Sequence, residues 1–132
     1  MKNLIILFAL IVELCASTTG KSTFTGTWEY RGGVFNGQVD GAPTAYALKR
    51  VYNNNHYKAI LIEKGSPNVI YEKGVYSLKA DTCFETQTYS LQPSKVTNKT
   101  IKYTFAIRKD TLKLFTVLPN GSRVVDDWLK VK

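Results

Sequence analysis

The sequence predicts an all-β fold, an antiparallel up-and-down barrel of about eight strands. Three observations predict it. Residues 18–132 break into short runs rich in Tyr, Val, Ile and Thr, which favour half-buried strands. Clusters of Gly, Asn, Asp and Pro separate these runs and are typical of turns. No stretch of this part has a sustained helical period. A β-sandwich remains the alternative, because both folds bury one face of each strand.

The first residues have the pattern of a secretory signal. Met1–Asn3 gives a short basic start, residues 4–12 form an unbroken apolar run, and small or polar residues follow from Ala16. A transmembrane helix needs roughly 20 apolar residues, so this run is too short to be one. We therefore expect residues 1–17 to be a signal peptide and residues 18–132 to form a single barrel domain of a secreted or periplasmic protein.

The two cysteines, Cys15 and Cys83, raise separate expectations. Cys15 suits a lipid anchor, since bacterial lipoproteins are cut before a lipidated Cys, and that anchor would attach the protein to the outer membrane or cell surface. Glu13 and Leu14 fit that signal poorly, so lipidation and the cleavage site stay open. Without Cys15, Cys83 has no partner for a disulfide, and we expect it to be a small buried side chain.

The expected strands are separated by residues that favour turns. Gly32-Gly33 ends the first run, and the Gly-rich residues 34–43 are expected to form a long loop or an irregular hairpin. Asn53–Asn55 and Asn120-Gly121 are turns, because Asn and Gly tolerate positive φ. Gly74 marks a bulge or a break. The expected strands cover, in order, residues 24–31, 46–52, 56–63, 69–71, 75–79, 82–91, 100–108, 111–117 and 123–131.

Alternation along the runs indicates which side chains face the core. It is clearest in residues 100–108, where one face is apolar and the other mostly polar. In the last run, Asp126 and Asp127 are adjacent and point to opposite faces, so they cannot serve one site. The orientation of Glu72 and Glu85 stays open, and a carboxylate facing inward would demand a partner.

Three short segments resemble a known family. Gly26-Thr27-Trp28 resembles the Gly-x-Trp signature that opens lipocalins and related calycin barrels. Residues 126–130, with Trp128, resemble the closing strand of small lipocalin-like proteins exported by Bacteroidetes-type bacteria, and residues 85–89 look like the middle of those proteins.

The resemblance implies a lipocalin-like barrel and a structural role for each end of the chain. In such barrels the Trp, here Trp28, plugs the closed end, and the Gly, here Gly26, lets backbone pass close beside it. A basic side chain of the last strand, Lys130 or Arg123, would lie across the Trp ring as a cation–π contact.

Neither the charge nor the motifs indicate a catalytic site or a nucleic-acid binding site. The net charge is +8, but Lys and Arg are scattered, which indicates a solvated outer face. The scattered Tyr residues and the export signal argue against nucleic acid. The sequence has one histidine, His56, and lacks the motifs of nucleophile elbows, phosphate loops and dinucleotide sites. We therefore expect no enzyme, no cofactor and no metal site, while the oligomeric state stays open.

The leading hypothesis is a non-enzymatic protein that binds a small, largely apolar ligand inside the barrel, and an anionic group on that ligand is one option. The alternative is an interaction or structural module with a filled barrel, whose partner binds the basic surface or the Gly-rich loop near residues 37–41. The candidate lining residues are aromatic side chains of the expected strands: Tyr46, Tyr57, Tyr76, Phe84, Tyr103 and Phe105.

Overall fold

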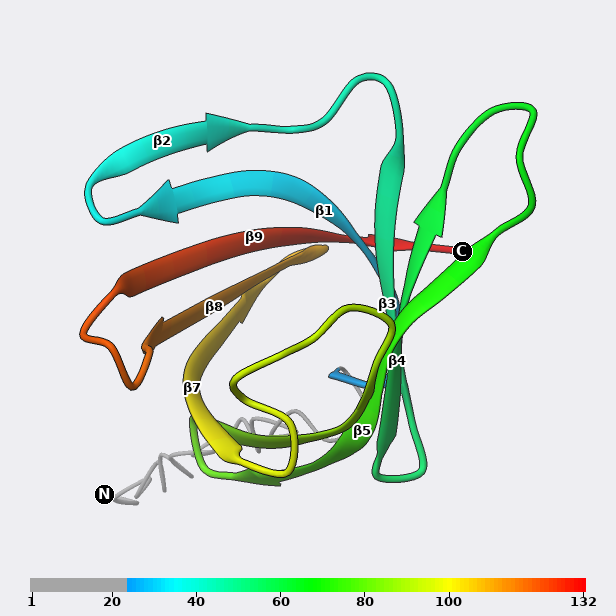
Figure 1. Cartoon of the computed structure of the whole chain (residues 1–132). Helices are drawn as coiled ribbons and strands as arrows, with labels where there is room; N and C mark the ends of the chain where they lie inside the picture. Colours follow the sequence, from blue (N-terminus) through cyan, green and yellow to red (C-terminus); the bar gives the residue numbers. More distant parts are fainter. Residues whose placement is uncertain (1–23) are drawn as a thin grey trace, which may run out of the picture.

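The computed structural model describes residues 24–132 as an all-β fold of nine antiparallel strands (Figure 1). The predicted signal peptide and Cys15 lie outside the described residues. Each strand pairs with its sequence neighbours, except that β2 pairs with β1 alone, and β1 also pairs with β9. That pairing closes an eight-stranded barrel, which confirms the predicted fold class and is consistent with a lipocalin-like architecture. The strands are β1 (Gly26–Phe35), β2 (Gln38–Gly41), β3 (Ala47–Asn53), β4 (His56–Ile62), β5 (Val69–Lys79), β6 (Thr82–Ser90), β7 (Thr100–Arg108), β8 (Thr111–Val117) and β9 (Arg123–Val131).

The Gly-rich region near the start forms a hairpin of β1 and β2, one of its two expected forms, but the expected end of the first strand was wrong. Gly32-Gly33 does not end the first strand, because β1 continues to Phe35 through an irregularity between Tyr30 and Gly33. The first half of β1 pairs with β3 and the second half with β2, while β9 follows the other edge. At Gly74 the structure has a bulge, one of the two expected outcomes, and not a break, since β5 is one strand with register shifts in its pairing on both sides. Local turn chemistry therefore marked bulges here and not strand ends.

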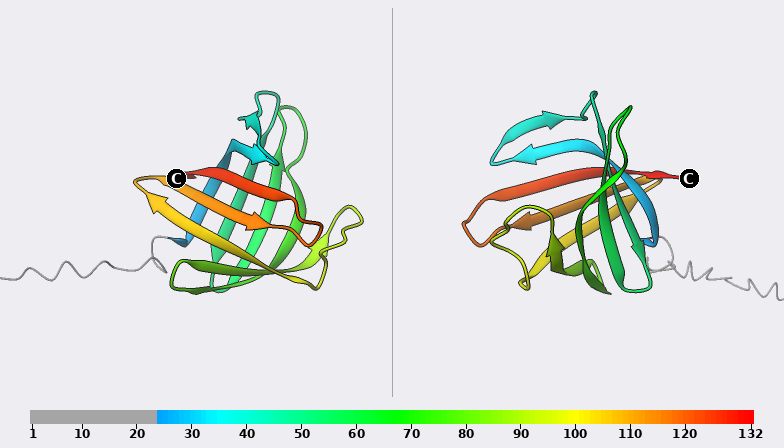
Figure 2. Two further views of the ribbon diagram at one scale, coloured as in Figure 1. Left: turned by 90° about the vertical axis from the view of Figure 1, so that its left-hand side faces the viewer. Right: turned by 45° about the vertical axis from the view of Figure 1, so that its right-hand side comes forward.

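The two ends of the barrel are built differently (Figure 2). At one end, two-residue turns join β3 to β4, β5 to β6 and β7 to β8. Asn54, Asn55, Ala80 and Lys109 in these turns have positive φ, as tight hairpins require. At the other end the connections are longer, as in residues 63–68 and 91–99. We call the first end closed and the second end open.

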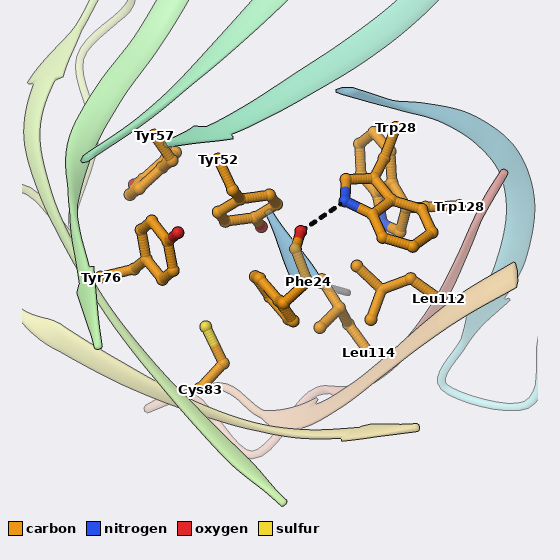
Figure 3. Close-up of a cluster of buried hydrophobic side chains, with 9 residues drawn as sticks. All are labelled: Phe24, Trp28, Tyr52, Tyr57, Tyr76, Cys83, Leu112, Leu114 and Trp128. Carbon is orange, nitrogen blue, oxygen red and sulfur yellow. Dashed lines mark hydrogen bonds between the residues drawn. The ribbon is translucent and has the colours of Figure 1, made fainter. Parts of the chain in front are cut away.

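An aromatic cluster fills the closed end (Figure 3). Phe24, just before β1, is fully buried, and its ring centroid lies 4.7 Å from that of Tyr52, 5.1 Å from Phe105 and 5.7 Å from Tyr76. The indole of Trp28 donates a 2.9 Å hydrogen bond to the Phe24 carbonyl. Each aromatic pair adds about 0.5–1.5 kcal/mol beyond the burial of its surface, so this plug anchors the fold.

Barrel closure at β1 and β9 depends on a close approach at Gly33. A methyl group there would overlap the Val125 carbonyl oxygen on β9, whereas nothing lies near the corresponding position of Gly41 on β2. We expect Gly33→Ala to lower the free energy of unfolding by about 1–3 kcal/mol or more. Gly41→Ala should change it by less than about 0.5 kcal/mol. Urea denaturation of both variants tests this, and equal stability would contradict the close approach.

Candidate functional site

A charged network crosses the middle of the barrel. Arg50 of β3 places Nη1 2.7 Å from Glu85 Oε1 on β6 and Nη2 3.4 Å from Glu72 Oε2 on β5. The Tyr52 hydroxyl donates to Glu85 Oε2 at 2.6 Å, and the Tyr57 hydroxyl donates to Glu72 Oε1 at 2.8 Å. Arg50 Nη1 also donates to the Tyr52 hydroxyl oxygen at 3.0 Å. These five side chains, from four successive strands, form what we call the Arg50 network.

The network corrects one interpretation of the sequence and resolves a second. The Arg50 side chain is only 11% exposed and faces the interior, so assigning it to a solvated basic surface was wrong. Glu72 and Glu85 both face inward, and Arg50 is the partner that such carboxylates demand. Alternation alone placed these residues on one of two faces, and only the pairing across β3 to β6 decides which.

Burial shifts the protonation equilibria of the network. Burial alone opposes the charge of Arg50, but Glu85 and then Tyr52 and Glu72 outweigh it, so the Arg50 pKa is raised well above its ordinary value. Burial is also the first cause of the raised pKa of Tyr52 and Tyr57, and the neighbouring carboxylates add to it. Arg50 therefore stays charged, and the two tyrosines stay protonated as hydrogen-bond donors.

Aromatic rings flank the guanidinium. Arg50 Cζ lies 5.1 Å from the Tyr57 ring centroid and 5.5 Å from that of Trp128, within cation–π distance. Trp128 is 5% exposed and also packs against Tyr30, with 5.3 Å between ring centroids. Among the described residues, its indole Nε1 is buried and has no hydrogen-bond partner. A buried donor of this kind calls for an acceptor, which makes the space beside Trp128 a candidate contact point for a ligand.

The open end leaves the network within reach of solvent and is bordered by a loop. The Glu72 side chain keeps 17% of its surface exposed although it points into the barrel. Residues 91–99 fold back onto β6, where Thr97 Oγ1 donates to Gln87 Oε1 at 2.9 Å and the Asn98 amide donates to the Gln87 carbonyl at 2.7 Å. This loop is therefore tied to a side chain that faces the interior just above Glu85.

The predicted lining residues separate into several groups. Tyr57 belongs to the network, and Tyr103 is half-buried nearby, its pKa raised by burial and by Glu85. Tyr76 and Phe105 instead pack on Phe24 in the closed-end cluster.

Two predicted lining residues do not face the interior site. Phe84 lies on the outer face, where the Lys102 amine is 5.9 Å from its ring centroid, so its placement inside was wrong. Hydrophobicity favoured Phe84 for the core, but β6 turns Cys83 and Glu85 inward, and adjacent residues alternate. Tyr46 precedes β3 and is 44% exposed, so it lies outside the buried network.

The residues singled out by the resemblance lie at the closed end and along β9. Lys130, and not Arg123, lies over Trp28, with 5.2 Å from Nζ to the ring centroid. A side chain at Gly26 would press on Lys130, so Gly26 leaves room for that contact. On β9, Trp128 faces inward, while Asp127 faces outward and pairs with Lys113 at 3.4 Å.

Three other features were sought in the described part of the chain: a metal-binding cluster, a cysteine–histidine pair and a membrane-spanning helix. Residues 24–132 contain no cluster of three or more His, Cys, Asp or Glu arranged to hold a metal ion. Cys83 is buried and its thiol pKa is raised, first by burial and then by Glu85, whereas His56 is exposed on the outer wall. The structure thus does not bring these two residues together. No helix within residues 24–132 is long and apolar enough to cross a membrane.

Comparisons with known proteins support the fold alone. No protein-family model matches the chain, and no curated protein does. One similar solved structure is an uncharacterized protein from Bacteroides eggerthii. It is 14% identical, with a TM-score of 0.58, and the match covers 81% of this chain and 98% of that one. The chain therefore shares its barrel with this bacterial protein, and the likeness assigns no function.

The Arg50–Glu85 pair should matter far more for stability than a surface pair of equal length. Glu85→Gln leaves a buried guanidinium with one carboxylate fewer, so we expect a loss of about 3–5 kcal/mol in the free energy of unfolding. Glu29→Gln removes the 2.7 Å pair with Arg31, which is 48% exposed, and should cost less than about 1 kcal/mol. Chemical denaturation measures both, and similar losses would contradict the role given to burial.

We expect the stability of the fold to depend on pH through Asp126. Burial raises its pKa above the ordinary value, Arg50 opposes this, and Asp127 and Glu85 add to it. The folded state therefore binds the Asp126 proton more tightly than the unfolded state, and its charge destabilises the fold near neutral pH. We expect Asp126→Asn to be more stable than the natural protein at neutral pH, with an advantage that shrinks as the pH falls through the raised pKa. Thermal unfolding across that range tests the sign, and a variant less stable at neutral pH would reverse it.

Proposed function

We propose that this protein binds a small amphiphilic molecule inside the open end of the barrel. The polar head group would contact the Arg50 network, and the mostly apolar body would lie along the walls above it. Leu48, Leu61 and Ile101 supply apolar surface there: each shares the inward face of its strand with a network residue or with Tyr103, and each is half-buried. Export through residues 1–17 to the periplasm, the medium or an anchored surface position is part of the proposal.

The observation that carries the proposal is the buried ionic network itself. Replacing a buried ion pair by well-packed apolar side chains is often neutral or stabilises a protein by about 1–4 kcal/mol. A barrel with a purely structural task would therefore gain nothing from Arg50, Glu72 and Glu85 in its interior. The partial exposure of Arg50 and Glu72 supports a recognition role, because a head group could reach these two side chains while Glu85 stays buried.

The charges around the network favour a head group that is not anionic. One guanidinium faces Glu72, Glu85 and Asp126, so the carboxylates outnumber it. The unpartnered Trp128 indole needs an acceptor, and the exposed part of Glu72 can accept a hydrogen bond. A neutral or cationic head group with both donor and acceptor atoms satisfies these groups, whereas a carboxylate or phosphate meets repulsion.

An interaction module remains the second candidate because of one apolar row on the outer wall. Val39, Val34, Val125 and Phe115 are register partners across β2, β1, β9 and β8. Val39 is 77% exposed and Phe115 is 40% exposed. The row ends at β2, whose second edge has no strand partner among the described residues, and such edges favour strand pairing with another chain.

A series of ligands with one body and three head groups tests the first candidate. Decanol, decylamine and decanoate are titrated against the protein while tryptophan fluorescence is followed. We expect saturable binding of the alcohol and the amine and weaker binding of decanoate, because the interior carboxylates repel the anion. Trp128→Phe should weaken binding of decanol about five- to tenfold, the typical contribution of one hydrogen bond, without loss of the fold by circular dichroism.

Native mass spectrometry of protein purified from its own host provides an independent measurement. A retained small molecule supports the ligand proposal and gives its mass. Absence of any bound mass, together with no saturable binding in the ligand series, would leave the interaction module as the better explanation. Tightest binding of decanoate would instead contradict the head-group argument.

A further inference from the structure

A hollow lies on the outside of the barrel, and its lining does not include the charged groups of the Arg50 network. Its volume is about 480 Å³, and it is formed by β3, β4, β5 and β6. Most of its side chains alternate with buried interior ones such as Tyr52 and Ala59, so they point to the outer wall. The hollow is lined by Val51, Asn53, His56, Tyr57, Lys58, Ile70, Lys73, Gly74 and Thr88.

Two lysines face each other across this hollow. Lys58 of β4 and Lys73 of β5 are direct register partners, and both side chains are exposed on the outer face. Like charges directly opposite one another destabilise a sheet. Neither lysine forms an ion pair, since the ion pairs of residues 24–132 involve Arg31, Arg50 and Lys113 as cations. The lining also contains no carboxylate. Within the described residues, the contact that offsets this charge is the Tyr89 ring, whose centroid lies 5.6 Å from the Lys73 amine.

The remaining groups of the hollow suit an anion that carries a carbon skeleton. His56, Asn53 and Thr88 bring hydrogen-bonding side chains beside the lysines, while Val51 and Ile70 add apolar surface. Thr88 occupies a bulge, because Lys73 pairs with Tyr89 and Gly74 with Gln87. Bulges commonly re-aim side chains beside binding sites. The volume leaves room for a ligand larger than a free phosphate ion.

We propose that this hollow binds a small organic phosphate or sulfate ester, with Lys58 and Lys73 on the oxyanion and His56, Asn53 and Thr88 as further polar contacts. The shared chemistry is a tetrahedral oxyanion on a short polar or apolar stem, whether free in solution or presented as a lipid head group. This site is independent of the interior one, and its ligand has the charge that the interior repels.

Glycerol phosphate is the probe for the soluble form, with glycerol as the uncharged control. Binding is followed by amide chemical shifts in a ¹H–¹⁵N spectrum of the full folded protein. We expect saturable shifts that gather at residues 51–58 and 70–74 with glycerol phosphate, and none with glycerol. Vesicles of phosphatidylcholine with and without phosphatidylglycerol form the second arm, read by co-sedimentation, and tell a membrane source from a soluble one.

The decisive variant is the double substitution Lys58→Gln and Lys73→Gln. It should weaken binding about tenfold or more, because it removes two charge-assisted contacts. It should also leave the fold intact, because both lysines are exposed and neither forms an ion pair with a described residue. The matched control is Lys102→Gln with Lys113→Gln, which changes the net charge equally on the opposite strands β7 and β8 and should leave binding within a factor of two.

Specific results would overturn the proposal. Shifts scattered over the whole basic surface, or equal weakening by the control pair, would show a general charge effect and not a site. Absence of saturable binding in both arms would also refute it. Binding in the vesicle arm alone that the double variant abolishes would retain the site and assign its ligand to a lipid head group.

Discussion

The contact on which the interior depends is the pair between Arg50 and Glu85. Arg50 lies on β3 and Glu85 on β6, so their 2.7 Å contact connects two strands that are not neighbours in the sheet. Once a guanidinium is buried there, its surroundings are strongly constrained. Glu72 supplies the second carboxylate, Tyr52 and Tyr57 donate to the carboxylate oxygens, and burial keeps both hydroxyls protonated. Loss of one member would leave buried polar groups without partners and would lower the free energy of unfolding by several kcal/mol. The five residues therefore depend on one another.

This network divides the barrel into two layers with different physical tasks. Below it, the aromatic plug around Phe24 and Trp28 is dry, and the one polar atom of the Trp28 ring is satisfied by the Phe24 carbonyl. Above it, the inward side chains of Leu48, Leu61 and Ile101 are half-buried, and the loop of residues 91–99 is hydrogen-bonded to the buried Gln87. The plug supplies stability through apolar burial, whereas the charged layer adds little stability of its own. Sites that cost stability are commonly those that serve binding, which is why the layer between plug and open end is the natural place for a ligand.

The sequence predicted those features that depend on near neighbours. The strands of residues 100–108, 111–117 and 123–131 coincide with β7, β8 and β9, because period-two runs and tight turns are local signals. Gly32-Gly33 was misinterpreted as a strand end, since a bulge and a terminus share the same local chemistry. The orientation of Phe84 and Glu85 was harder to predict. Hydrophobicity favours Phe84 for the core, whereas Glu85 is the interior residue because it pairs with Arg50, which lies 35 positions away in the sequence. The Lys58–Lys73 pair also required register, which no alternation pattern contains.

The placement of charge on the two sides of one wall explains how a chain with a net charge of +8 can offer two opposite environments. On β5, Glu72 points inward to Arg50, and the next residue, Lys73, points outward to the hollow. On β3, the Arg50 side chain points into the barrel, where it contacts the carboxylates of Glu85 and Glu72 and does not add to the charge of the outer surface. Alternation thus separates an interior in which carboxylates outnumber the guanidinium from an outer wall with two lysines that have no carboxylate partner among the described residues, across the thickness of a single strand. The two proposed sites would therefore differ first in the charge of the ligand that they accept, before any difference in shape is considered.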